Sequence, residues 1–168
     1  MQKIGAIREI EAILLPKIQK LAAEIRTTLA HDITEIGTGL SALRLLRTIA
    51  HEETNQILHE AMLLVAANWL IHNHPTAKSL AWAWNPRQTG GASEPDLQGI
   101  RGSKVIISAE ATTSIEPKGL IDQRMAETLF KLSKMADEKY YFVAGTKMKQ
   151  RAETKIRRTR YKITVVEL

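Results

Sequence analysis

Two acidic residues, Asp96 and Glu110, flank a short turn within the stretch "EPDLQGIRGSKVIISAEATTS", residues 94–114. Asp96 follows a proline and opens a short extended segment, and Glu110 lies near the end of an apolar, β-branched run that favours a strand. The "RGSK" sequence between them is typical of a tight turn, which would pair the two segments and bring the carboxylates together. Two converging carboxylates offer the oxygen ligands that Mg²⁺ requires and leave coordination positions open. The sequence therefore predicts a metal site at Asp96 and Glu110 that binds Mg²⁺, with Mn²⁺ as its substitute.

A third acid, Glu60, lies inside an apolar helical stripe between Ile57 and Leu64. An unpaired carboxylate is costly in such a position, which makes Glu60 a candidate functional residue. The alternative is that Glu60 lies on the edge of the stripe, where it reaches solvent or pairs with an arginine.

Two helical stretches are predicted before the acidic residues. The first occupies about the first 30 residues, where Pro16 should kink it or start a second helix. The glycine-containing "EIGTGLS", residues 35–41, is predicted to be a break, and a second helix should run from about residue 41 to about residue 72, stopped by Pro75. The first helix is predicted from apolar residues that recur at spacings of three and four, namely Ile7, Ile10, Leu14, Ile18, Leu21, Ile25 and Leu29.

The rest of the chain alternates between strand and helix patterns. We expect strands at "SLAWAW", "DLQGI" and "KVIISAEATT", and then a helix, a strand, a second helix from Thr146 to about Arg160, and a closing strand at "YKITVVEL". Strands joined through single helices indicate parallel crossovers, and strands joined by turns indicate an antiparallel meander. The predicted fold class is therefore α/β, with a mixed sheet flanked by helices on both faces.

Composition sets limits on the protein class. The chain has 168 residues, 44% of them hydrophobic, which fits a single globular domain. It contains no cysteine, which excludes disulfides and thiolate metal sites. The sequence has no signal-peptide pattern, and its longest apolar stretch is shorter than a membrane span. We expect a soluble, cytoplasmic protein.

Positive charge is concentrated near the C-terminal end of the sequence. The net charge is +6, and the segment from Lys147 to Lys162 contains eight basic residues and a single acid, Glu153. A solvated helix usually mixes both signs, so this clustering favours a surface that contacts phosphates, although a merely soluble helix face is the alternative. The predicted DNA contacts are Lys147, Lys149, Arg151, Lys155, Arg157 and Arg158.

The motif "EPDLQG", a turn, and "VIISAEATT" together resemble the PD-(D/E)xK nuclease superfamily, which includes type II restriction endonucleases and Holliday-junction resolvases. The resemblance covers roughly residues 55 to 168. It implies a restriction-endonuclease-like fold in which Asp96 and Glu110, joined by Glu60 from the preceding helix, bind Mg²⁺. It also implies a DNA endonuclease that hydrolyses phosphodiester bonds, and a homodimer, because cutting both strands of a duplex needs two active sites.

One position departs from the family pattern. Thr112 stands where the motif lysine is expected, and a threonine can form hydrogen bonds but supplies no positive charge. Lys118, Gln123 and Arg124 are predicted as substitutes, and Thr112, Lys118 and Gln123 are the candidate catalytic residues beside the two acids. If none of them replaces the lysine, the alternative is a non-catalytic DNA-binding or assembly protein on the same fold.

The domain organisation that follows is a single nuclease-like domain over residues 1–168. Within it, residues 1–36 would form a helical arm and residues 55–168 the catalytic core. The apolar stripe of the arm would form a dimer, dock another partner, or cover the sheet of its own domain.

Overall fold

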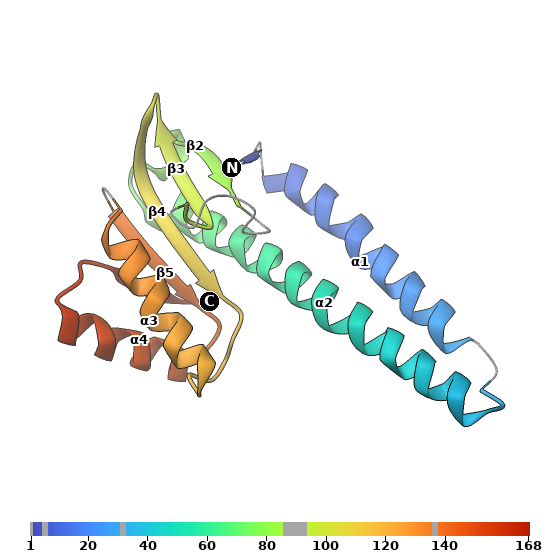
Figure 1. The fold of residues 1–168 in the computed structure, drawn as a ribbon. Helices are drawn as coiled ribbons and strands as arrows, with labels where there is room; N and C mark the ends of the chain where they lie inside the picture. The colour runs from blue at the N-terminus through green and yellow to red at the C-terminus, as the bar shows by residue number, and fades with distance from the viewer. Residues whose placement is uncertain (1, 5–6, 31–32, 86–93, 136–137) are drawn as a thin grey trace.

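The computed structural model describes residues 2–4, 7–30, 33–85, 94–135 and 138–168. The chain is an α/β protein in which two N-terminal helices precede a mixed sheet with interleaved helices (Figure 1). The helices are α1 (Ile7–Leu29), α2 (Ile36–Asn73), the short 3₁₀ helix η1 (Ala77–Ser79), α3 (Leu120–Ser133) and α4 (Thr146–Thr159). The strands are β1 (Gln2–Ile4), β2 (Ala81–Trp84), β3 (Leu97–Arg101), β4 (Lys104–Thr112), β5 (Glu138–Val143) and β6 (Thr164–Glu167).

The strands lie in the sheet in the same order as in the chain, from β1 to β6. The pairs β1–β2, β2–β3 and β3–β4 are antiparallel, whereas β4–β5 and β5–β6 are parallel. A two-residue turn connects β3 and β4, and α3 and α4 connect the parallel strands, as the alternating patterns predicted. The antiparallel partners β1 and β2 are separated in the chain by α1, α2 and η1.

Helices cover both faces of the sheet. On one face α2 packs against strand residues that include Trp82, Leu97 and Phe142. On the other face α3 and α4 pack against Tyr141 and Val143, whose side chains alternate with that of Phe142 along β5. The prediction of a mixed sheet with helices on both faces is confirmed.

The N-terminal region differs from the prediction in two ways. Residues 2–4 form β1, which pairs with β2, instead of the start of a helix. Three residues carry too little pattern for a sequence signal, and pairing with a neighbouring strand decides their conformation. In addition, α1 continues through Pro16 as one helix and does not give way to a second one.

The predicted break at residues 35–41 is also wrong, because α2 begins at Ile36 and includes both glycines of that segment. The Gly39 backbone N–H donates to the Glu35 carbonyl oxygen at 3.0 Å, which closes the first helical turn. Glycine costs a helix on the order of 1 kcal/mol through backbone entropy, and packing of the whole helix can outweigh this local cost. As a result α2 runs without interruption through residues 37–54, between the predicted arm and the predicted core.

Together α1 and α2 form a helical hairpin that extends away from the sheet (Figure 1). Some residues of the predicted apolar stripe of α1 face the core, and others face solvent. Leu14 is buried and Leu21 packs against the same core cluster, whereas Ile18 and Leu29 remain exposed. Within the described part of the chain, no helix is both long enough and apolar enough to cross a membrane.

Candidate active site

The β3–β4 hairpin determines which residues face one another at the candidate site. Arg101 pairs with Lys104 across a two-residue turn, in which Gly102 has a φ of +61° that favours glycine. The register shifts by one residue at Gly99 and Ile100. Such a bulge places two residues of one strand opposite one residue of the other.

Because of this bulge, Leu97 pairs with Ala109. Continuing the register by one residue places Asp96 opposite Glu110, whereas the register at the turn would have placed Asp96 opposite Ala109. Both acids are almost inaccessible, with 1% of Asp96 and 3% of Glu110 exposed. The structure therefore brings the two predicted acids together in the interior.

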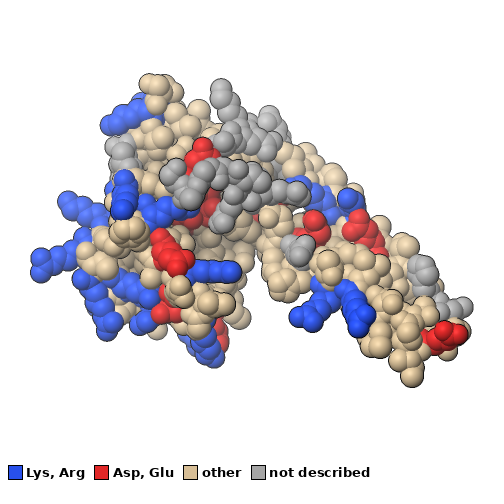
Figure 2. Space-filling view, viewed as in Figure 1, with Lys and Arg blue, Asp and Glu red and all other residues tan. Residues whose placement is uncertain are grey.

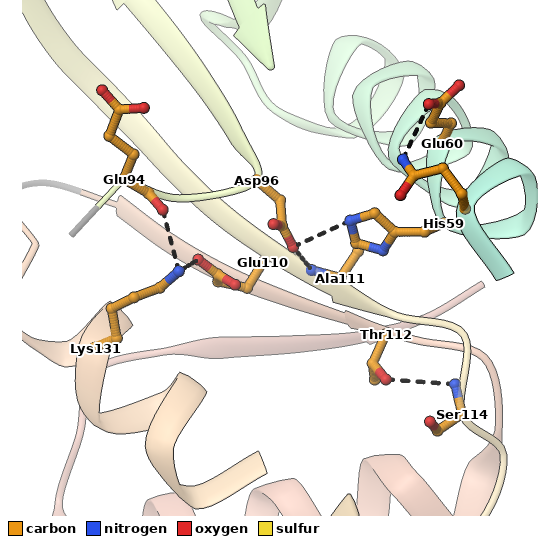
Figure 3. A network of polar contacts seen from close by, with 10 residues as sticks. His59, Glu60, Glu94, Asp96, Glu110, Ala111, Thr112, Ser114 and Lys131 are labelled. Carbon is orange, nitrogen blue, oxygen red and sulfur yellow. Dashed lines mark hydrogen bonds and ion pairs between the residues drawn. The ribbon is translucent and has the colours of Figure 1, made fainter. Parts of the chain in front are cut away.

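Asp96 lies immediately before the first residue of β3 and is held there by contacts from β4 and α2. Its Oδ2 atom accepts a hydrogen bond of 3.0 Å from the Ala111 backbone N–H of β4 (Figure 3). The His59 Nε2 atom, from α2, lies 3.7 Å from the same oxygen. This nitrogen is buried and forms no hydrogen bond with a described residue. The sequence analysis did not identify His59 as part of the site.

Glu110 contacts a lysine that the sequence analysis also missed. The Lys131 Nζ atom, from α3, lies 2.5 Å from Glu110 Oε1. Lys131 also donates a hydrogen bond of 3.1 Å to the Glu94 carbonyl oxygen, so that its ammonium group is fixed between the two (Figure 3). Burial and then the charge of Asp96 raise the pKa of Glu110 to about 8, although Lys131 opposes the shift.

Tyr141 completes the surroundings of the acids. It lies opposite Glu110 in the β4–β5 register and is 2% exposed. Burial, followed by the charges of Glu110 and Asp96, raises the pKa of the Tyr141 hydroxyl, so this group stays protonated beside them. The site therefore holds two carboxylates, one ammonium group and one neutral phenol in a largely dehydrated space.

Lys131 could have been found from the sequence by following the chain direction. Since β4 and β5 are parallel, α3 must run back across the sheet from the end of β4 to the start of β5. Lys131 precedes the buried Leu132 in the second half of α3, where the helix has returned toward the level of the acids. The sequence analysis considered only cations near the start of α3, on the wrong end of the helix.

The predicted substitutes for the motif lysine contact other groups. Lys118 is 81% exposed in its side chain and pairs with Glu116 at 2.5 Å. Gln123 is exposed and donates a hydrogen bond of 3.1 Å to Glu127, and Arg124 is also exposed. The Thr112 Oγ1 atom accepts a hydrogen bond of 3.3 Å from the Ser114 backbone N–H, within its own turn (Figure 3).

Glu60 does not join the two acids. It is fully buried on α2, where Lys17 of α1 contacts Oε2 at 2.5 Å and Gln56 donates to Oε1 at 3.0 Å. The buried Glu60 carboxylate is therefore compensated by an ion pair. The alternative in the sequence analysis was a pair with an arginine, and the partner is a lysine instead. Among the described residues, no three histidine or acidic side chains converge closely enough to hold a metal ion. The prediction that Glu60 is a third metal ligand beside Asp96 and Glu110 is therefore wrong.

The donor set of Asp96 and Glu110 nevertheless fits a hard cation. Both side chains offer carboxylate oxygens, and Glu110 Oε1 is buried without a hydrogen bond to a described residue other than its ion-pair contact. Burial and then the charge of Asp96 raise the pKa of Glu110, and a divalent cation between the acids would offset both effects by favouring the ionised form. Two carboxylates with remaining positions for water are the usual protein share of a Mg²⁺ site.

The basic residues of α4 fall into two groups. Lys147 pairs with Glu116 at 2.7 Å, and both Arg151 and Lys155 pair with Asp122 of α3, at 2.8 Å and 3.1 Å. Lys118 and then Lys147 lower the pKa of Glu116 to about 2, and Arg151 and Lys155 hold the pKa of Asp122 below its ordinary value.

The second group is open to solvent. Arg157 and Arg158 are exposed in the last turn of α4, while Lys149 is half-buried. Figure 2 shows lysine and arginine side chains gathered over the part of the surface where α3 and α4 lie. Of the predicted DNA contacts, Arg157 and Arg158 are thus the most accessible, and three others already have acidic partners.

Comparison of the chain with protein-family models, with curated proteins and with solved structures gives no match.

Proposed function

We propose that the protein is a metal-dependent endonuclease that hydrolyses phosphodiester bonds in DNA, with a restriction-endonuclease-like fold. The observation that carries the proposal is the buried acid pair, Asp96 and Glu110, with Lys131 against it. A buried acid pair in which burial and then the neighbouring charge raise the pKa of Glu110 destabilises the fold unless it serves a ligand. The meander, the crossover helix and the positions of the acids agree with the sequence resemblance.

Asp96 and Glu110 would hold Mg²⁺, or Mn²⁺ in its place. When bound, such an ion lowers the pKa of a water molecule and offsets negative charge on a phosphate. The protein supplies the rigid orientation of the ligands. The Ala111 N–H fixes the Asp96 carboxylate, and the β4–β5 pairing fixes the backbone at Glu110.

Lys131 takes the role of the missing motif lysine in this proposal. Its ammonium group lies in contact with Glu110 and would stabilise the negative charge that develops on the scissile phosphate. Lys118 and Gln123 are less suited to the role, because their side chains contact Glu116 and Glu127 instead. Thr112 remains a neighbour of the acids on β4 that supplies no charge.

DNA is the proposed partner, and the exposed Arg157 and Arg158 would contact its backbone phosphates. Such contacts contribute affinity that does not depend on sequence. Cleavage of both strands of a duplex requires two active sites, which a homodimer provides.

A non-catalytic DNA-binding protein on the same fold is the second candidate. It is favoured by one observation, that the β4 position of the motif lysine holds Thr112, whose hydroxyl group is bonded to the Ser114 N–H. In that case Lys131 would only neutralise Glu110.

Nicking of supercoiled plasmid tests the proposal. The wild type, Asp96→Asn and Glu110→Gln would be incubated with DNA and either Mg²⁺ or Mn²⁺, and Glu127→Gln would serve as the control because Glu127 is an exposed carboxylate on α3. We expect nicking by the wild type and the control, and a loss of at least 100-fold in the two site variants. Wild-type binding to DNA without any nicking would favour the second candidate, and equal nicking by all four proteins would exclude this site.

A further inference from the structure

Helix α1 presents an apolar face that no described element covers. Leu14, Leu21 and Thr28 point toward α2 and the core. The neighbouring positions form a second row at spacings of three and four, a pattern typical of a coiled-coil seam. This second row, called the outer seam below, consists of Leu15, Ile18, Ala22, Ile25 and Leu29.

The outer seam is open to solvent although it contains no polar residue. Leu15 is 57% exposed, Ile18 is 48% exposed and Leu29 is 59% exposed, while Ala22 and Ile25 are half-buried. In Figure 1, α1 lies at the edge of the molecule, with α2 along one side of it. A face of this kind on a helix normally packs against another surface.

The total exposed surface of the chain is larger than that of a typical monomeric protein of the same mass. A monomeric globular protein of 18.8 kDa exposes roughly 8,300 Å², whereas this chain exposes 10493 Å². The surplus is larger than the ~800 Å² that each partner buries in a standard protein interface. Eleven of the fourteen exposed large apolar side chains that the structure describes lie between residues 13 and 65, on the hairpin. The unburied apolar area is therefore concentrated on α1 and α2.

The order of residue sizes in the outer seam identifies the partner. Read in either direction it is leucine, isoleucine, alanine, isoleucine, leucine. A two-fold axis through Ala22 would place Leu15 level with Leu29 of a second copy, and Ile18 within one residue of the level of Ile25 of that copy, an offset of about 1.5 Å. An isologous contact requires this self-complementarity, and the small central side chain lets the helices approach most closely where they cross.

We propose that the outer seam is a homodimer interface in which α1 pairs antiparallel with α1 of a second copy. Gln19 and Arg26 flank the seam, and antiparallel pairing places Gln19 within one residue of the level of Arg26 of the other copy, so no like charges meet there. The outward face of α2 is a poorer candidate. Its exposed Ile36, Leu40 and Leu43 are followed by Arg47 and His51, which interrupt the apolar surface and remove the symmetry.

Sedimentation and light scattering of the full chain at micromolar concentration provide the first test. We expect a dimer for the wild type and a shift to monomer for Ala22→Glu, since two glutamates would meet at the axis. Ala23→Glu is the matched control, because Ala23 is exposed one position around the helix. The control should remain dimeric, and circular dichroism should show unchanged helix content in both variants. A monomeric wild type would overturn the proposal.

Disulfide cross-linking tests the register, since the natural chain contains no cysteine. Ala22→Cys should form a covalent dimer on mild oxidation, and Ala23→Cys should not. Leu15→Cys and Leu29→Cys should each stay uncoupled alone and cross-link when mixed. Cross-linking of either leucine variant with itself would indicate a parallel pair, and cross-linking of Ala22→Cys no faster than Ala23→Cys would exclude the seam. None of these readouts depends on the nuclease activity.

Discussion

Helix α3 takes part in two groups of charged residues that are built in opposite ways. In the first, Lys131 reaches a buried acid pair in which burial and then the charge of Asp96 raise the pKa of Glu110 to about 8. In the second, Asp122 lies between Arg151 and Lys155 near the surface, and its pKa is held below the ordinary range. The first group has an unfavourable electrostatic environment and the second a favourable one.

This difference separates a candidate site from a structural contact. The partly exposed ion pairs of Asp122 link α3 to α4 at little energetic cost and contribute correspondingly little to stability. Burial of the acid pair costs the desolvation free energy of two carboxylates, and a single lysine compensates only part of this cost. A cluster that destabilises its own fold is the more informative of the two about function.

The largest expected effect comes from substituting Lys131 and Lys118 with methionine, one at a time, which tests whether the buried group is the functional one. Under the proposed function, Lys131→Met should lower plasmid nicking by about 100-fold or more, because the site loses its cation. Lys118→Met should change nicking by less than about threefold, because Lys118 is an exposed partner of Glu116. Nicking rates with saturating Mg²⁺ measure both. The reverse order of effects would restore Lys118 as the motif substitute and leave Lys131 a structural role.

The sequence was sufficient to predict the acids and the order of the strands and helices around them. Asp96, the "RGSK" turn and the β-branched run before Glu110 are local signals, and local signals determine a hairpin. The β-bulge at Gly99 was not predictable, although it decides that Glu110 rather than Ala109 faces Asp96. A one-residue shift in register depends on packing over the whole sheet.

The remaining misses have the same origin. His59 reaches Asp96 from α2, which is distant in sequence, and no spacing rule connects it with the motif. The chain direction indicates the half of α3 that holds Lys131, but the contact with Glu110 depends on how α3 packs on the sheet. Glu60 was correctly recognised as unusual, but whether a metal ion or a lysine compensates it depends on how α1 packs against α2, where Lys17 lies. Local patterns do not contain this tertiary information.

The electrostatic strain in the acid pair should appear as a pH-dependent stability difference between the wild type and Glu110→Gln. The folded-state pKa of Glu110 is raised from 4.5 to about 8, so its contribution to stability is present below about pH 4.5 and is lost as the pH rises through 8. Glutamine does not titrate. In EDTA, the variant should therefore gain on the order of 2–4 kcal/mol relative to wild type between pH 5 and pH 9. Urea unfolding across this range measures the gain, and a constant difference would mean that Glu110 is not strained.

The smallest expected effect concerns the two classes of basic residue on α4. Replacing Arg157 and Arg158 by glutamine should weaken DNA binding and reduce the slope of log affinity against log salt by about 2, because each exposed arginine neutralises about one phosphate. Replacing Arg151 and Lys155 by glutamine should change the slope by less, since Asp122 already offsets their charge. Both double variants remove the same formal charge, so fluorescence anisotropy titrations at several salt concentrations compare them directly. Equal slopes would show that the Asp122 ion pairs open on binding, and the distinction between paired and exposed basic residues would then have no bearing on DNA recognition.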